Sequence, residues 1–349
     1  MNVMDQPSSN PSRRVRLAAK QASMADVARR AGVSVITVSR ALRHPEQVAD
    51  HTRRAIDTAM AELGYVPNLI AGGLAATQTR IVTVIVPFVT HGVFADAIQG
   101  VADALEGAGY CVLLGNSGGS IEREEAIVRM LLGHRPAGVV IQGANHTDAT
   151  RRMLVNAGVP VVEIGTLPRE PIDSAVGYSN FEAARVMTAH LAAGRRRISF
   201  LSAPPDANDR AAARLAGYEA ALSEAGLPFD RDLVLHTRFG IQEGHAALGK
   251  LLALPRPPDA VFCTSDLWAV GMVTECARRG IPVPRALAIA GFNDQDIASE
   301  TAPPLTTVRV PRYQIGRRAG ELILARIEGS EASAQLIDLG FELVCREST

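Results

Sequence analysis

Val35, Ile36 and Arg40 carry side chains that could read a DNA duplex, and they fall on one side of a short helical pattern. Aliphatic groups can contact thymine methyls in the major groove, and an arginine can reach a guanine or a phosphate. Hydroxyl groups on the same helix can bind phosphates and fix its register without reading the base sequence. The hydroxyl residues assigned this role are Ser34, Thr37 and Ser39.

Two short helices joined by a glycine turn would present these side chains. Residues 25–31 favour a first helix, Gly32 allows a tight turn, and Ser34 is a good cap for a second helix. A third amphipathic helix follows in residues 51–63, and residues 64–68 read as an extended stop. The pattern predicts a helix-turn-helix, whose second helix enters the major groove. A plain helical hairpin with two exposed aliphatic residues is the alternative.

The charge distribution supports a nucleic-acid partner. Residues 13–69 hold ten Arg or Lys and five Asp or Glu, whereas residues 70–349 carry a net charge of −4 and the whole chain is neutral. A basic N-terminal module on a mildly acidic body is typical of a nucleic-acid binder with a separate regulatory part. A solvated basic surface is the alternative explanation of the same charges.

Composition restricts the class of protein. The chain has 349 residues, 47% of them hydrophobic and 21% charged, which suits a globular protein of more than one domain. It has no run of 18 apolar residues, so we expect no membrane span. Its cysteines lie far apart without metal-ligand spacing and predict reduced thiols in a cytoplasmic protein that needs no cofactor. These cysteines are Cys111, Cys263, Cys276 and Cys345.

From residue 80 onward, short apolar runs alternate with helical patterns, which predicts an α/β fold of parallel sheets covered on both faces. About ten such units are too many for one compact sheet, so two doubly wound lobes fit better. Ligands bind at the carboxyl ends of such strands, and two facing lobes can close on a small molecule. The candidate residues at strand ends are Phe88, Asn116, Gln142, Thr166, Asp266 and Asn293.

Three further side chains suggest what that small molecule is. Phe239 could stack on the apolar face of a sugar. Arg210 and Arg214 lie at the entry of one helical pattern, where a guanidinium could hold a carboxylate through two hydrogen bonds. A solvated helix face is the alternative for each arginine.

The segments DVA (26–28), AGVS (31–34), TVSR (37–40) and GYVPN (64–68) resemble the N-terminal headpiece of the LacI family of bacterial repressors. The resemblance covers nearly everything after residue 23. It implies a headpiece followed by a short hinge helix and a two-lobed core that resembles periplasmic sugar-binding proteins. In the hinge, Leu74 matches a leucine that enters the minor groove and kinks the operator. Asn68 is also assigned to the DNA contact, and Gly72-Gly73 should leave the hinge unfolded off DNA.

The resemblance also sets the expected boundaries. We expect a disordered basic arm in residues 1–23, the helix-turn-helix in 24–68, the hinge helix in 69–79 and the effector-binding core in 80–349. Lobe one should comprise about 80–178 and 311–334, and lobe two about 179–310 and 335–349.

Within the family, four core segments resemble the gluconate-utilisation repressors: residues 175–191, 261–266, 288–297 and 336–343. The resemblance implies a sugar acid, gluconate or a relative, as the effector, and double-stranded operator DNA as the partner of a homodimer or a higher homo-oligomer. A regulator of another sugar or sugar phosphate is the alternative within the family.

Two other classes of protein compete with a repressor. An enzyme lacks support, because the eight histidines form no H-E-x-x-H and neither G-x-S-x-G nor a P-loop occurs. The turn GNSGGS at 115–120 lacks the P-loop lysine. A periplasmic sugar-binding protein would carry a signal peptide, whereas residues 1–23 are polar and basic without an apolar region.

Overall fold

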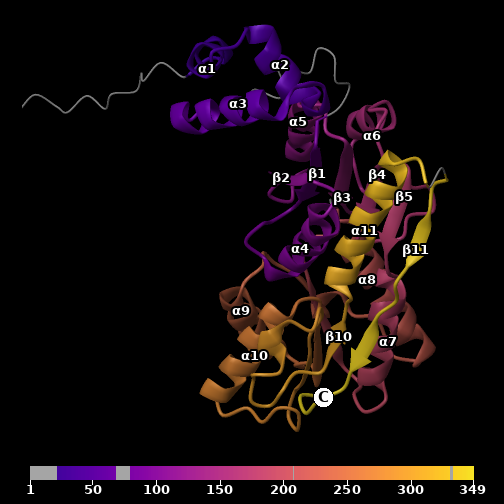
Figure 1. Cartoon of the computed structure of the whole chain (residues 1–349). Coiled ribbons are helices and arrows are strands. Elements are labelled where there is room, and N and C mark those ends of the chain that lie inside the picture. Colours follow the sequence, from indigo (N-terminus) through magenta and orange to yellow (C-terminus); the bar gives the residue numbers. More distant parts are fainter. Residues whose placement is uncertain (1–21, 68–78, 207, 331–332) are drawn as a thin grey trace, which may run out of the picture. The chain divides into compact units, whose positions relative to one another are not determined.

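The computed structural model describes residues 22–67, 79–206, 208–330 and 333–349 (Figure 1). The chain divides into two compact units, residues 1–76 and 77–349. Most of the expected arm and nearly all of the expected hinge, including Asn68, Gly72, Gly73 and Leu74, lie outside the described residues. Among the described helices, none combines the length and the apolar character needed to cross a bilayer.

The first unit is a three-helix domain, and its helices, its glycine turn and its serine cap are as predicted from the sequence. Its helices are α1 (Met24–Ala31), α2 (Val35–Arg43) and α3 (Asp50–Leu63), with a 3-10 turn between the last two. Gly32 ends α1 in the left-handed region, with φ of 68°, and the Ser34 hydroxyl caps α2 by accepting from the Thr37 amide. The small core of the unit is Val27, Ala28, Val38, Ala41, Ile56 and Ala59.

The first lobe of the second unit is built on a six-stranded parallel sheet in the order β11-β5-β4-β3-β1-β2. Alternate residues of each strand face opposite layers of helices, as the two-residue period of a strand requires. In β1, Val82 and Val84 pack towards α4 and α11, whereas Ile85 packs towards α5. The bounds are β1 (Ile81–Val86), α4 (Gly92–Glu106), β2 (Cys111–Asn116), α5 (Ile121–Leu132), β3 (Gly138–Gln142), α6 (Asp148–Val155), β4 (Val161–Ile164), β5 (Ser174–Gly177), α11 (Arg312–Ile327) and β11 (Leu336–Asp338).

The second lobe has a four-stranded parallel sheet in the order β7-β6-β8-β9. Its strands read as apolar runs because helices cover the sheet. The bounds are α7 (Asn180–Ala192), β6 (Ile198–Ser202), α8 (Asp209–Glu224), β7 (Val234–His236), α9 (Ile241–Leu252), β8 (Ala260–Cys263), α10 (Asp266–Arg278), β9 (Ala288–Ala290), β10 (Thr307–Arg309) and β12 (Glu342–Val344).

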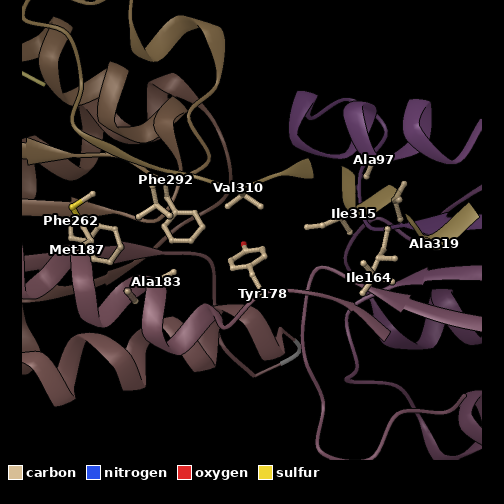
Figure 2. Packing of buried hydrophobic residues seen from close by; sticks show 14 of the residues in the cluster. Ala97, Ile164, Tyr178, Ala183, Met187, Phe262, Phe292, Val310, Ile315 and Ala319 are labelled. Atoms are coloured by element: carbon tan, nitrogen blue, oxygen red, sulfur yellow. The ribbon is translucent and has the colours of Figure 1, made fainter. Parts of the chain in front are cut away.

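The chain crosses between the lobes near Tyr178 and Val310, both buried. Figure 2 shows these two side chains between a second-lobe group that contains Phe262 and Phe292 and a first-lobe group that contains Ile164. One continuous apolar cluster therefore joins the lobes at the crossover and supports the site beside it.

The expected assignment of residues 335–349 to lobe two is wrong in part. β11 pairs in parallel with β5 and so extends the sheet of lobe one, whereas β12 pairs with β10 in an antiparallel ribbon. Gly340, with φ of 67°, lies between the two strands where the chain changes partners. β11 has a physical reason to stay in lobe one, because it satisfies the backbone groups of β5 at an otherwise open edge.

Helices α4 and α11 lie side by side (Figure 1). Glycines on both helices form the closest approach. A Cβ atom at Gly316 would clash with the backbone carbonyl of Ala97, and one at Gly100 would clash with the carbonyl of Tyr313. Backbone cannot move aside as a flexible side chain can, so these helices stay in contact only while both positions remain glycine.

We expect Gly316→Ala to destabilise the core by about 1–3 kcal/mol, because overpacking forces the two helices apart. Gly249→Ala is the matched control. Gly249 also lies within a helix, but a Cβ there meets only Arg279 Nη2 at 3.8 Å. That variant should be neutral or gain up to about 1 kcal/mol from helix propensity. Urea unfolding measures both, and equal stabilities of the two variants would contradict the packing account.

Candidate functional sites on the recognition helix and in the interlobe cleft

The first candidate site is the outer face of α2. Val35 is 45% exposed and Ile36 is 71% exposed, although Val38 on the same helix is fully buried. Arg40 is also exposed. The three predicted base-reading side chains therefore share a solvent-facing surface, where nothing in the folded domain requires two aliphatic residues.

The predicted phosphate-binding hydroxyls have partners within the helix. The Ser34 hydroxyl lies 2.8 Å from the Thr37 hydroxyl, and Arg43 donates a hydrogen bond to the Ser39 hydroxyl. These are local bonds at the exposed surface, so a phosphate oxygen can replace them at small cost in free energy. The other two predicted DNA contacts, Asn68 and Leu74, lie outside the described residues.

The second candidate site is a cleft of about 570 Å³ bounded by residues from both lobes. A cleft of this volume suits a small organic ligand. Six of the residues predicted from strand ends and helix starts line it: Phe88, Gln142, Arg210, Arg214, Phe239 and Asn293.

Three predicted residues do not line this cleft. Asn116 is exposed at the end of β2, the outermost strand of its sheet. The backbone of Thr166 packs closely against Gly177, where a Cβ atom would clash with it. Asp266 is fully buried behind the cleft wall. A strand end marks one edge of a sheet, but only some positions along that edge face the opposite lobe.

Asp266 shapes the cleft without entering it. Its carboxylate accepts hydrogen bonds from the Gln295 amide at 2.8 Å and the Thr307 hydroxyl at 2.7 Å. Burial raises the pKa of Asp266 to about 7, and these two hydrogen bonds act in the opposite direction. They hold the loop in which Asn293 and Asp294 take positive φ values of 104° and 51°. Asp266 therefore fixes the strained loop that presents Asn293 to the cleft.

Arg214 is the most unusual group in the cleft. Its Nε donates to Asn180 at 2.9 Å, its Nη1 to the Thr264 carbonyl at 3.1 Å, and its Nη2 to the Tyr178 hydroxyl at 3.0 Å. The guanidinium carbon also lies 3.9 Å from the centre of the Phe292 ring, a cation–π contact. All of these partners are neutral. Among the described residues, no carboxylate lies within ion-pair distance of Arg214.

Burial lowers the pKa of Arg214, but an arginine keeps its charge in proteins. A buried charge without a counter-ion is unfavourable. The cleft therefore holds a fixed positive charge, oriented by neutral partners, that an anion could neutralise.

Arg210 differs from Arg214 in this respect. Its Nη1 donates to Asp209 at 2.9 Å, and the other Asp209 oxygen accepts from the Ala144 amide at 3.2 Å. Asp209 begins α8 in the second lobe, and Ala144 follows β3 in the first, so this bond connects the two walls of the cleft. Arg210 is therefore a neutralised side chain next to an interlobe contact rather than a free cation.

Phe239 lies in an aromatic cluster that also connects the walls. Its ring stacks on Trp268, with ring centres 4.8 Å apart and planes within 10°. The ring of His91, from the first lobe, lies 4.7 Å from Phe239 and 4.7 Å from Phe88. The face of Phe239 against Trp268 is therefore not available to a sugar, which restricts the stacking role expected from the sequence.

Comparisons with known proteins identify the domains that carry the two candidate sites. Residues 23–68 match the pattern of "Bacterial regulatory proteins, lacI family", and residues 188–349 match that of the periplasmic binding protein-like domain. The chain is 37% identical over 326 residues to the HTH-type transcriptional regulator GntR of Escherichia coli K12, which covers 93% of this chain and 97% of the relative. This chain belongs to the LacI family.

Solved structures of other LacI-family regulators have the same architecture. A LacI-family regulator from Silicibacter pomeroyi aligns with a TM-score of 0.88 at 33% identity, covering 94% of this chain and 99% of that one. The regulator GntR from Chromobacterium violaceum aligns with a TM-score of 0.73 at 38% identity, covering 77% of this chain and 98% of that one. This LacI-family chain is a DNA-binding transcriptional repressor, and its relatives are transcriptional regulators, not enzymes.

Several cleft residues of this LacI-family repressor were not predicted from the sequence. Arg238 precedes Phe239 and is exposed in the cleft, and Asn145 follows Gln142 by three positions. Both residues lie two or three positions beyond the end of a strand, so a strand-end rule that covered these positions would have included them. Glu124 and His91 gave no such signal, because each lies in or beside a helix and enters the cleft only through tertiary packing.

Glu124 belongs to a buried charged cluster in the first lobe. His146 Nδ1 lies 2.6 Å from Glu124 Oε1, and His146 Nε2 lies 3.7 Å from Glu163 Oε1. Burial alone would lower the pKa of His146, but the hydrogen bond with Glu124 and the negative charges of Glu124 and Glu163 raise it to about 9. His146 is therefore a buried imidazolium between two carboxylates.

This raised pKa predicts how stability depends on pH. The His146 contribution should be fully present below about pH 6.5 and lost as the pH rises to about 9, a change of about 3 kcal/mol. We expect the unfolding free energy of the wild type to exceed that of His146→Gln at pH 6 and to approach it by pH 9.5. The exposed His134→Gln is the control and should follow the wild type. A constant difference between wild type and His146→Gln would contradict a buried imidazolium.

Proposed function

We propose that this repressor acts as a homodimer on a pseudo-palindromic operator and that a sugar acid such as gluconate, bound in the interlobe cleft, releases it from DNA. The observation that carries the effector part is the buried guanidinium of Arg214, which faces the cleft without a carboxylate partner among the described residues.

Arg214 has donors left for a carboxylate. A guanidinium has five N–H groups, and the three neutral partners of Arg214 engage one each on Nε, Nη1 and Nη2. One N–H therefore remains on each terminal nitrogen, and a charge-assisted hydrogen bond to a carboxylate can use these donors. A neutral sugar would occupy the cleft but leave the charge of Arg214 uncompensated.

The rest of the cleft suits a polyhydroxylated chain. Gln142, Asn145 and Asn293 supply amide donors and acceptors, and Thr237 and Thr264 supply hydroxyl groups. Arg238 adds a second cation at the rim. The resemblance to gluconate-utilisation repressors and the names of the GntR relatives agree with this chemistry. A regulator of a sugar phosphate is the second candidate, because a phosphate would also neutralise Arg214.

For the DNA side, we propose that α2 enters the major groove and that residues 69–79 form the hinge, with Leu74 in the minor groove. One recognition helix reads few base pairs, so useful specificity needs two copies related by symmetry. Effector binding would hold the cleft closed, move the two first lobes of the dimer and separate the hinges. A coupling of about 1–3 kcal/mol, or roughly 5–150-fold in operator affinity, is typical of such two-site systems.

Two variants test whether the side chains of α2 read the base sequence while the basic arm contributes only charge. We expect Ile36→Ala to alter which base pair is preferred at the contacted position, because Ile36 offers its methyl groups to base edges. The difference in binding free energy between base pairs at that position should change by about 1–3 kcal/mol. The control is Arg14→Gln with Arg16→Gln in the basic arm. It should weaken all DNA alike and flatten the salt slope by up to about 0.9 per lost phosphate contact. Selection from randomised operators measures the preference, and an altered preference in the arm variant would contradict this division.

The cleft yields the test of the effector. In Arg214→Met, we expect the gluconate concentration that releases operator to rise roughly 10- to 100-fold, because a charge-assisted hydrogen bond is worth about 1.5–3 kcal/mol. Ligand-free operator affinity should stay unchanged. Arg196→Met, an exposed arginine outside the cleft, is the matched control. Operator titrations with increasing gluconate measure the response, and an undiminished response in Arg214→Met would remove this residue from the effector site.

A further inference from the structure

We propose that Glu124 makes the cleft selective for monocarboxylates, by accepting a hydrogen bond from a hydroxyl of the effector and repelling a second anionic group, and that His146 and Glu163 are the positioning residues that hold its carboxylate. The inference rests on the proposed function, since it concerns the end of the sugar acid distant from its carboxylate.

Glu124 has an oxygen available to a ligand. The residue lies in the first turn of α5 and lines the cleft, although its side chain is only 9% exposed. Its Oε1 is held by His146 Nδ1 at 2.6 Å. Within the part of the chain that the structure describes, no group donates a hydrogen bond to the other oxygen, Oε2. A carboxylate with one oxygen fixed and the other free in a cleft is a preorganised acceptor for a hydroxyl.

The two residues behind Glu124 fix the position of its carboxylate. His146 is 2% exposed and Glu163 is fully buried. Glu163 Oε2 is anchored by the Ile172 amide at 2.6 Å, while Glu163 Oε1 and His146 Nε2 face each other without a hydrogen-bond partner. Two carboxylates and one imidazolium give this cluster of three residues a net negative charge. The raised pKa of His146 agrees with the charged form of the ring.

The cleft therefore has two poles of opposite sign. Glu124 lies on α5 in the first lobe, and the unneutralised Arg214 lies on α8 in the second, so the poles are on opposing walls. A ligand that bridges the walls would place its carboxylate at Arg214 and a neutral hydroxyl at Glu124. A diacid of the same length would bring its second carboxylate against Glu124, where burial keeps the repulsion strong.

The test compares two ligands that differ at one end, gluconate and glucarate, by isothermal titration calorimetry on the full-length protein at pH 7. We expect the wild type to bind gluconate at least tenfold more tightly than glucarate. In Glu124→Gln, which keeps an acceptor oxygen but no charge, the ratio should fall to about threefold or less, mainly through tighter glucarate binding. Glu125→Gln is the matched control, because its side chain pairs with Arg129 and Thr147 and does not line the cleft.

His146→Gln separates positioning from simple structural damage. A structural defect would weaken both ligands equally, whereas a misplaced Glu124 carboxylate should lower the gluconate-to-glucarate ratio. Wild-type protein that binds both ligands equally, or a ratio that Glu124→Gln leaves unchanged, would overturn the proposal while leaving the sugar-acid effector intact. Failure of the wild type to bind either ligand would instead reject the proposed function.

Discussion

The arrangement of the interlobe cleft depends on one buried positive charge, the guanidinium of Arg214. Arg214 is held by Asn180, Tyr178 and Thr264 and by the ring of Phe292, which places it where the chain crosses between the lobes. Neutral partners satisfy part of its hydrogen bonding but none of its charge. The apolar cluster that contains Tyr178 and Phe292 packs behind the guanidinium. The proposed sugar acid would supply the missing negative charge, and this is why the proposal for the effector rests on the packing around Arg214.

The cleft also couples effector binding to the contacts between the two lobes. The hydrogen bond between Asp209 and the Ala144 amide joins the two walls, and so does the contact of His91 with Phe239. A ligand with a carboxylate for Arg214 and a hydroxyl for Glu124 would add to these interlobe contacts rather than replace them. Its binding free energy would then favour the closed core over the open one, which is the differential affinity that a switch requires.

Local patterns in the sequence predicted the helices and strands well. They predicted less well how these helices and strands contact one another. Gly32 and Ser34 define the turn between α1 and α2 through their own backbone and side-chain chemistry, so the helix-turn-helix followed from the sequence. The strand-end rule found Gln142 and Asn293 but also chose Asn116, because strand order decides which ends face the opposite lobe. The placement of β11, the stacking of Phe239 on Trp268 and the cluster around His146 join residues distant in sequence, and no local pattern indicates such pairs.

The central claim is that a carboxylate, and not a polyol alone, is what the core recognises. Gluconate and glucitol provide the direct comparison, because they share the same polyhydroxylated chain and differ only in the carboxylate. Calorimetric titration of the wild-type protein with each compound at pH 7 should give binding of gluconate at least a hundredfold tighter than that of glucitol, equivalent to about 2.7 kcal/mol. Equal affinities, or tighter binding of glucitol, would contradict the account.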